Sequence, residues 1–254
     1  MSNSNGKVAV ITGATGGIGF AVAKRLGEDG YTVILNGIDD EAGAERVKEL
    51  TAEGFTAEYY GFDVTNEEAV TSNIKSIGEK YGKIDTLVNN AGGLGGRSRF
   101  EEMTTEFYRS VMALNLDSTF FASRAAIPFL KKGEDASIIN YTSNAAWTAG
   151  GPGAGIYGTS KAGVNTITKA LAKDLAEYGI RVNAVSPGTI DTPFHAQIKS
   201  TKPEVFASWA NSIMLGRLGQ PEDVAGVVSF LASSDAKFIT AETIQIGGGQ
   251  ALGI

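Results

Sequence analysis

Tyr157 and Lys161 stand four positions apart in the segment YGTSK. On a helix, residues i and i+4 lie on one face with their Cβ atoms about 5–6 Å apart. A phenol normally keeps its proton until about pH 10, and a fixed ammonium group beside it favours the phenolate. The pair could therefore make a tyrosine into an acid and base near neutral pH, although an isolated pair of this kind is more often part of a half-exposed helix face.

The composition limits the chemistry that this chain of 254 residues can perform. It contains no cysteine, which excludes disulfides, thiolate–zinc sites and cysteine nucleophiles. It contains one histidine, His195, which is too few for a metal site built from several histidines, and we expect no metal. Catalysis would therefore depend on tyrosine, lysine, serine, carboxylates or a bound cofactor.

Charge and hydropathy narrow the expected partners. The formal net charge is −6, whereas broad nucleic-acid binding needs a basic face. No apolar stretch approaches the ~20 residues that span a bilayer, and the start MSNSNGKVAV lacks the charged and apolar regions of a signal peptide. We expect a cytoplasmic protein that binds a small molecule, with no nucleic acid and no membrane as partner.

Short β-branched runs alternate with longer helical patterns along the chain. The expected strands are Lys7–Thr12, Thr32–Asn36, Thr56–Phe62, Ile84–Asn90, Ala136–Thr142, Ile180–Ser186 and Thr243–Gly247. The expected helices are one that ends near Asp29, then Glu41–Glu53, Asn66–Tyr81, Thr104–Leu130, Gly155–Tyr178 and Pro221–Ala232. This alternation predicts an α/β fold over residues 1–254, a single-domain Rossmann fold with a doubly wound, seven-stranded parallel sheet and helices on both faces.

The segment Asp191–Leu218 interrupts the alternation and contains Pro193, Pro203 and Trp209. A long insert between a strand and a helix is often a mobile cover of a functional site. We therefore predict a substrate lid at about residues 191–218.

The segment TGATGGIG, Thr12–Gly19, falls between the first expected strand and the first expected helix. Spaced glycines at Gly13, Gly17 and Gly19 allow the backbone to approach a ligand closely, and the N-terminus of the helix favours a pyrophosphate. The Gly-Lys-Ser/Thr of a P-loop is missing, and Gly37 stands where a methyltransferase would usually carry an acid. The context predicts dinucleotide binding.

Four motifs in order closely resemble the short-chain dehydrogenase/reductase family. They are TGATGGIG, NNAG (Asn89–Gly92), Ser143 ahead of YGTSK, and SPGTIDT (Ser186–Thr192), and the resemblance runs from about Gly6 to Gly249. It implies a single-domain Rossmann fold, usually tetrameric, that moves hydride between NAD(P) and an alcohol or carbonyl.

The resemblance also implies residue roles. Tyr157 would be the general acid and base, and Lys161 would hold the nicotinamide ribose and lower the pKa of the phenol. Ser143 would orient the substrate oxygen, although Thr142 restores the more usual spacing to the tyrosine, and Asn115 would hold a water that links Lys161 to solvent. The residues implied to contact the cofactor are Gly13, Thr15, Gly17, Ile18, Gly19, Gly37, Ile38, Asp63, Val64, Asn90, Ala91, Gly92, Tyr157, Lys161, Pro187, Gly188, Ile190 and Thr192.

The end of the second strand discriminates NAD from NADP, because an acid there binds the ribose hydroxyls and repels a 2′-phosphate. The acidic position of the family is Gly37, and the position that is often basic is Ile38, so neither sign is present. Thr15 in the glycine-rich turn brings no cation, and Asp39 and Asp40 follow at once. These residues favour NAD, with NADP as the alternative.

Arg97 and Arg99 follow NNAG, and His195 opens the predicted lid. The arginines are either solvated loop residues or a clamp for a substrate carboxylate, and the histidine either faces solvent or contacts substrate. The pattern resembles family members that act on sugars or uronate-type keto acids. The alternative enzyme is a 3-oxoacyl-[acyl-carrier-protein] reductase, and the alternative of a different class is a non-catalytic dinucleotide-binding scaffold or redox sensor.

The expected helix Thr104–Leu130 and the helix that carries YGTSK are apolar on more sides than one sheet face requires. We therefore predict a dimer across these helices, and the family resemblance implies a homotetramer. The tail IQIGGGQALGI could add a second contact between chains.

Overall fold

A computed structural model describes residues 6–250 of the chain. Within this range, seven parallel strands form one sheet in the order β3-β2-β1-β4-β5-β6-β7. The strands are β1 Val8–Ile11, β2 Thr32–Gly37, β3 Ala57–Gly61, β4 Thr86–Asn89, β5 Ser137–Tyr141, β6 Arg181–Pro187 and β7 Thr243–Ile246. The prediction of a doubly wound, seven-stranded parallel sheet is therefore confirmed.

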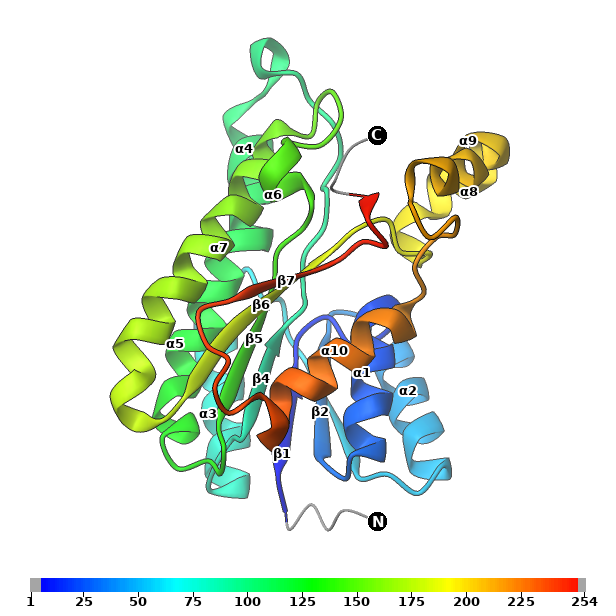
Figure 1. The fold of residues 1–254 in the computed structure, drawn as a ribbon. Coiled ribbons are helices and arrows are strands. Elements are labelled where there is room, and N and C mark those ends of the chain that lie inside the picture. The colour runs from blue at the N-terminus through cyan, green and yellow to red at the C-terminus, as the bar shows by residue number, and fades with distance from the viewer. Residues whose placement is uncertain (1–5, 251–254) are drawn as a thin grey trace.

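Helices cover both faces of the sheet (Figure 1). They are α1 Gly17–Glu28, α2 Asp40–Ala52, α3 Glu67–Tyr81, α4 Thr105–Met112, α5 Ser118–Leu130, α6 Ala145–Thr148, α7 Gly155–Leu175, α8 Ala196–Thr201, α9 Pro203–Ser208 and α10 Pro221–Ala232. One face carries α1, α2 and α10, and the other carries α3, α5 and α7. In the part of the chain that the structure describes, no helix is both long enough and apolar enough to span a membrane.

Alternating residues of each strand build two separate cores. In β1, Ala9 and Ile11 pack into the core beneath α1, which includes Leu26. Val8 and Val10 point to the opposite core, beneath the other helix layer. All four strand residues are buried because both faces are covered, and this explains the unbroken apolar run in the sequence.

The strand order places a crevice at the carboxyl ends of the central strands. The chain runs outward from β1 to β3 and then returns to β4 on the other side of β1, so the connections leave these two central strands in opposite directions. In open parallel sheets, ligands bind outside the carboxyl ends of the strands at such a switch point. Any site should therefore lie where β1 ends at Ile11 and β4 ends at Asn89.

The predicted helix Thr104–Leu130 is not continuous. A wider π-helical turn, Ala113–Asp117, separates α4 from α5. The Asn115 side chain, at the centre of that turn, donates to the Val111 carbonyl at 2.9 Å, and the Ser118 hydroxyl donates to the Leu114 carbonyl at 2.7 Å. These polar side chains take backbone acceptors that a regular helix would use internally, which is a known cause of local widening.

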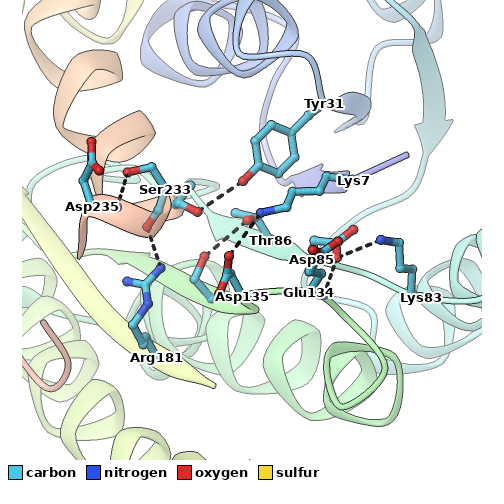
Figure 2. Close-up of polar contacts among 12 residues, drawn as sticks. Lys7, Tyr31, Lys83, Asp85, Thr86, Glu134, Asp135, Arg181, Ser233 and Asp235 are labelled. Atoms are coloured by element: carbon cyan, nitrogen blue, oxygen red, sulfur yellow. Dashed lines mark hydrogen bonds and ion pairs between the residues drawn. The ribbon is translucent and has the colours of Figure 1, made fainter. Parts of the chain in front are cut away.

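Figure 2 shows a polar network at the amino-terminal ends of the strands. The crevice lies at their carboxyl ends, on the opposite side of the sheet. Asp85 is fully buried, and its carboxylate accepts hydrogen bonds from the backbone amides of Val8 at 2.7 Å and Glu134 at 2.6 Å. Lys83 forms an ion pair with it at 3.2 Å. One carboxylate thus ties the starts of β1 and β4 to the turn before β5, which fixes the frame that the site is built on.

The segment 191–218 leaves the sheet after β6 and holds α8 and α9, which stand apart from the main body in Figure 1. Its two ends are fastened together: the Gly219 amide donates to the Thr189 carbonyl at 3.0 Å, and the Asp191 amide donates to the Gly219 carbonyl at 2.8 Å. This closure coincides with the boundaries expected for a lid, while its movement remains a prediction.

Candidate active site

A cavity of about 570 Å³ opens at the carboxyl ends of the central strands. Its size is within the range of small-molecule and cofactor sites. All eighteen residues implied to contact the cofactor line it, and so do Ser143, Arg97 and His195. The crevice that the strand order requires is therefore also the place where the sequence motifs converge.

The glycine-rich turn is shaped by close backbone packing. Gly13 has a φ of +63°, and a Cβ there would lie 2.9 Å from Ala91 Cα. A Cβ on Gly19 would lie 2.3 Å from the Gly13 carbonyl oxygen. Residue Gly16, at the N-cap of α1, offers no side-chain cap, so the first amides of this helix are free to meet an anion. The turn fits the pyrophosphate of a dinucleotide.

Two asparagines hold the turn in place. The Asn90 side chain donates to the carbonyls of Thr12 at 3.0 Å and Gly13 at 2.8 Å. Asn36, at the end of β2, accepts from the Gly13 amide at 3.3 Å and donates to the Phe62 carbonyl at 2.9 Å. Asn36 was not among the predicted site residues, although a polar residue that interrupts an apolar strand near its carboxyl end is a signal for such a role.

The spacing of Tyr157 and Lys161 places both on the first turns of α7, facing the cavity. Lys161 is only 3% exposed, and its Nζ donates to the Tyr141 carbonyl at 2.9 Å. That nitrogen lies 5.9 Å from the centre of the Tyr157 ring. Because burial disfavours the charged form, the pKa of Lys161 is lowered to about 8.

A lowered pKa of Tyr157 is predicted for a site that also holds the oxidised nicotinamide, and in the protein alone the direction is the opposite. Burial raises this pKa above the ordinary value of a phenol, and the hydrogen bond with Ser143 opposes that rise. The Lys161 ammonium does not offset the burial, because it is directed to the Tyr141 carbonyl and its own charge is disfavoured. The spacing of the motif predicted that Tyr157 and Lys161 lie close together, but it could not predict how strongly burial disfavours their charged forms.

The structure separates Ser143 from its neighbour Thr142. Ser143 is half-buried, lines the cavity beside Tyr157, and is the residue whose hydroxyl acts to lower the pKa of Tyr157. The Thr142 hydroxyl is buried and, among the residues the structure describes, has no hydrogen-bond partner. The geometry therefore favours Ser143 as the group that meets a substrate oxygen, although Thr142 gives the more usual sequence spacing.

Asn115 lies behind the cavity wall. It is fully buried, and its side chain both accepts from the Gly93 amide at 2.9 Å and donates to the Gly93 carbonyl at 2.8 Å. A Cβ on Gly92 would lie 2.8 Å from Asn115 Oδ1 and 2.9 Å from Lys161 Nζ. A side chain at position 92 would therefore collide with both Asn115 and Lys161, and glycine allows these two polar groups to lie close to the same part of the cavity wall.

The two arginines after NNAG do not form a joint clamp. Arg97 lines the main cavity, and its guanidinium donates to the Pro152 carbonyl at 2.9 Å. Arg99 lines a separate cavity of about 280 Å³ on the other side of the same loop. His195 lines the main cavity and packs on Trp209, with ring centres 5.3 Å apart, so it belongs to the segment 191–218.

The end of β2 leaves little space for a larger residue. A Cβ on Gly37 would lie 2.5 Å from Thr15 Cγ2, so the threonine fills the place of a side chain at position 37. Ile38 is 81% exposed at the cavity rim. The Asp39 carboxylate caps α2 by accepting from the Ala42 amide at 3.0 Å. No cation lines this end of the cavity among the described residues.

The fold and the cleft define an α/β protein of the dinucleotide-binding class. Comparison with known proteins identifies the family within this class. A family model described as Enoyl-(Acyl carrier protein) reductase matches residues 13–251. An uncharacterized oxidoreductase of Methylorubrum extorquens is 40% identical over 250 residues, which are 98% of this chain and 99% of that protein. The 3-oxoacyl-[acyl-carrier-protein] reductase of Thermotoga maritima is 39% identical over 244 residues, 96% of this chain and 97% of that protein. The ligand-free aldohexose dehydrogenase of Thermoplasma acidophilum has a TM-score of 0.88 at 34% identity, covering 98% of this chain and 95% of that chain.

The chain belongs to the short-chain dehydrogenase/reductase family. It is an NAD(P)-dependent oxidoreductase that acts on CH–OH or carbonyl groups. The family and the enzyme class predicted from the sequence motifs are both confirmed.

Proposed function

We propose that this enzyme interconverts a small hydroxy compound and its carbonyl, with Tyr157 as the general acid and base. One observation carries the proposal: Tyr157, Lys161 and Ser143 meet on one cavity whose other end is the glycine-rich turn. A nicotinamide bound in this cavity would supply or accept the hydride. The protein's own residues would then only have to orient the substrate oxygen and move one proton.

The proton would move at the Tyr157 hydroxyl. In carbonyl reduction the phenol donates its proton to the oxygen that becomes the alcohol, and in oxidation the phenolate takes it back. Ser143 orients that oxygen through its hydroxyl. Lys161 stabilises the phenolate at the moment when the tyrosine is charged, and Asn115 holds a water that resupplies protons past Gly92.

We further propose that the nucleotide is NAD rather than NADP. A 2′-phosphate would lie near the end of β2, where the described cavity wall offers Gly37 and the apolar Ile38 and no cation. The arginine and the lysine that line the cavity are Arg97, on the loop after β4, and Lys161, on α7, and both lie across the switch point from β2. With no arginine or lysine to pair it, the phosphate would remain uncompensated beside the acidic start of α2.

The substrate is proposed to be a sugar or uronate-type keto acid. Arg97 lines the cavity and forms no ion pair with a carboxylate of the described residues, and Asp63 is the only carboxylate residue among those that line it. A substrate carboxylate could form a two-point contact with this arginine. The aldohexose dehydrogenase that resembles the chain supports a sugar, whereas the 3-oxoacyl reductase relative supports an acyl thioester as the alternative.

A carbonyl panel tests this proposal directly. Keto-uronates, neutral ketoses and 3-oxoacyl thioesters are offered with NADH and with NADPH, and initial rates give kcat/KM for each pair. We expect the highest value for a keto acid with NADH. The Arg97→Met variant should raise KM for the keto acid about 10- to 100-fold with little change for neutral ketoses, since a hydrogen-bonded charge is worth about 1.5–3 kcal/mol.

Arg99→Met is the matched control, because Arg99 lies on the same loop but lines the other cavity. It should leave KM for the keto acid within about twofold of the wild type. A preference for acyl thioesters that is insensitive to Arg97 would replace the keto-acid proposal by the acyl-carrier alternative. Binding of nucleotide with no turnover of any carbonyl would favour the scaffold or sensor.

We also infer that the enzyme is a homotetramer. Tyr108 on α4, Phe120 on α5 and Trp147 on α6 are 44%, 43% and 55% exposed, and these helices lie on one flank of the molecule (Figure 1). Large exposed apolar side chains on one flank are typical of an interface. Light scattering at micromolar concentration should give about four chain masses, and a monomer at that concentration would refute the inference.

A further inference from the structure

The side chain of Gln250, beyond the last strand, reaches back to the loop that follows β6. Its Oε1 accepts from the Thr189 amide at 2.9 Å and from the Thr189 hydroxyl at 3.1 Å. Its Nε2 donates to the same hydroxyl at 2.9 Å and to the Ser212 hydroxyl at 3.5 Å. One amide side chain therefore joins a wall of the cavity to the end of the segment 191–218.

The tail and the loop are packed without spare room. The Gly188 amide donates to the Ile246 carbonyl at 2.9 Å. A Cβ on Gly188 would lie 2.8 Å from both Gln250 Oε1 and Gly247 Cα. The backbone of the loop is thus held against the tail, while Gly188 and Thr189 also line the cavity. A shift of the tail would be transmitted to this wall.

The same tail also touches the segment 191–218 through its backbone. The Leu215 amide donates to the Gly248 carbonyl at 3.2 Å. Gly249 has a φ of +88°, and a Cβ there would lie 2.6 Å from Met214 Sδ. The tail therefore packs between the cavity loop and the returning end of the segment, which is fastened to Thr189 through Gly219.

We propose that Gln250 is a positioning residue that fixes the Thr189 loop at the nicotinamide end of the cavity and couples it to the segment 191–218. This inference rests on the proposed function, because it takes that end of the cavity as the nicotinamide site. Gln250 does not line the cavity and touches none of the proposed catalytic side chains, so it acts on the cavity through the loop at Gly188 and Thr189 and on the segment 191–218 through Ser212. Losing it leaves the Thr189 amide and hydroxyl without their acceptor and frees the loop.

The test compares Gln250→Met and Gln250→Glu with the control Gln245→Ala, an exposed glutamine on the preceding strand. Quenching of tryptophan fluorescence gives the Kd for NAD⁺, and steady-state rates give kcat and KM. We expect Gln250→Met to raise the Kd and the KM for NAD⁺ about five- to tenfold, since about 1 kcal/mol of hydrogen bonding is lost. The melting temperature should stay close to that of the wild type. Gln250→Glu keeps the acceptor oxygens and should restore the Kd to within about twofold of the wild type.

Limited trypsin digestion measures the coupling to the segment independently of nucleotide. The cleavable bonds follow Lys199 and Arg217, whose side chains are 44% and 54% exposed. Both Gln250 variants have lost the donor to Ser212 and should be cut faster than wild type and Gln245→Ala. Wild-type Kd and digestion rates in Gln250→Met would overturn the inference, as would a raised Kd that Gln250→Glu does not restore. If the wild type binds no nicotinamide nucleotide, the proposed function fails, and unchanged digestion would separately refute the coupling.

Discussion

Turnover by the Tyr157→Phe variant is expected to fall about 10²- to 10⁴-fold in kcat, the usual contribution of a positioned general acid or base. The substitution removes one oxygen and leaves the ring, so the shape of the cavity wall is kept. Affinity for the nicotinamide cofactor should therefore stay within about twofold of the wild type. Steady-state rates, followed at the absorbance of reduced nicotinamide, give kcat, and equilibrium binding gives the affinity for the cofactor.

Tyr141→Phe provides a matched control for this prediction. Tyr141 lines the same cavity, but its hydroxyl is buried and has no partner among the described residues. Removing that hydroxyl should leave kcat near the wild-type value. A Tyr157→Phe enzyme that retains kcat within tenfold would exclude the phenol as the proton donor. A protein that binds nucleotide equally well with either tyrosine replaced and turns over nothing would be a scaffold or sensor.

Much of the site could be predicted because its residues follow strand ends. Gly13, Asn90, Ser143 and Pro187 each stand at or just past the carboxyl end of a strand, and parallel strands bring those ends together whatever the intervening sequence. The alternation of strands and helices was enough to predict that geometry. The eighteen cofactor positions, which the family resemblance implied, all line one cavity.

The features that sequence analysis missed depend on burial and on contacts between distant segments. The spacing of Tyr157 and Lys161 showed that they are neighbours, but the direction of the phenol pKa depends on how far both are removed from water. Arg97 and Arg99 are only two positions apart in the sequence, yet they line two different cavities. The contact of Gln250 with Thr189 spans 61 residues, and no local pattern records it.

Lys161→Met is expected to remove most turnover and at the same time to change how stability depends on pH. The buried ammonium has a pKa of about 8 in the folded protein, whereas a lysine in an unfolded chain titrates near 10.4. Between these values the unfolded state binds more protons than the folded state, so the free energy of unfolding rises with pH. Below pH 8 the buried Lys161 ammonium lowers the free energy of unfolding by its full amount, about 3 kcal/mol. Above pH 10.4 this effect is absent.

Urea unfolding at pH 7.5 and pH 9.5 measures this contribution. The wild type should gain roughly 2 kcal/mol over this interval from Lys161, and the variant should lack that gain. The tyrosines with raised pKa values are partly ionised in the unfolded chain at pH 9.5, but both proteins carry them, so their contribution cancels in the comparison. If the free energy of unfolding depends on pH in the same way in both proteins, the pKa of Lys161 is not lowered by burial.

The combination of the two readouts separates chemistry from packing. Methionine fills a similar volume without a charge, so at pH 7.5 it should relieve the cost of the buried ammonium, less the loss of the hydrogen bond to the Tyr141 carbonyl. A lysine retained only for packing would give a variant that is at least as stable and equally active. A variant that is at least as stable at pH 7.5 but turns over at least about 100-fold more slowly requires the charge itself, since only an ammonium can stabilise a phenolate formed in the same buried cavity.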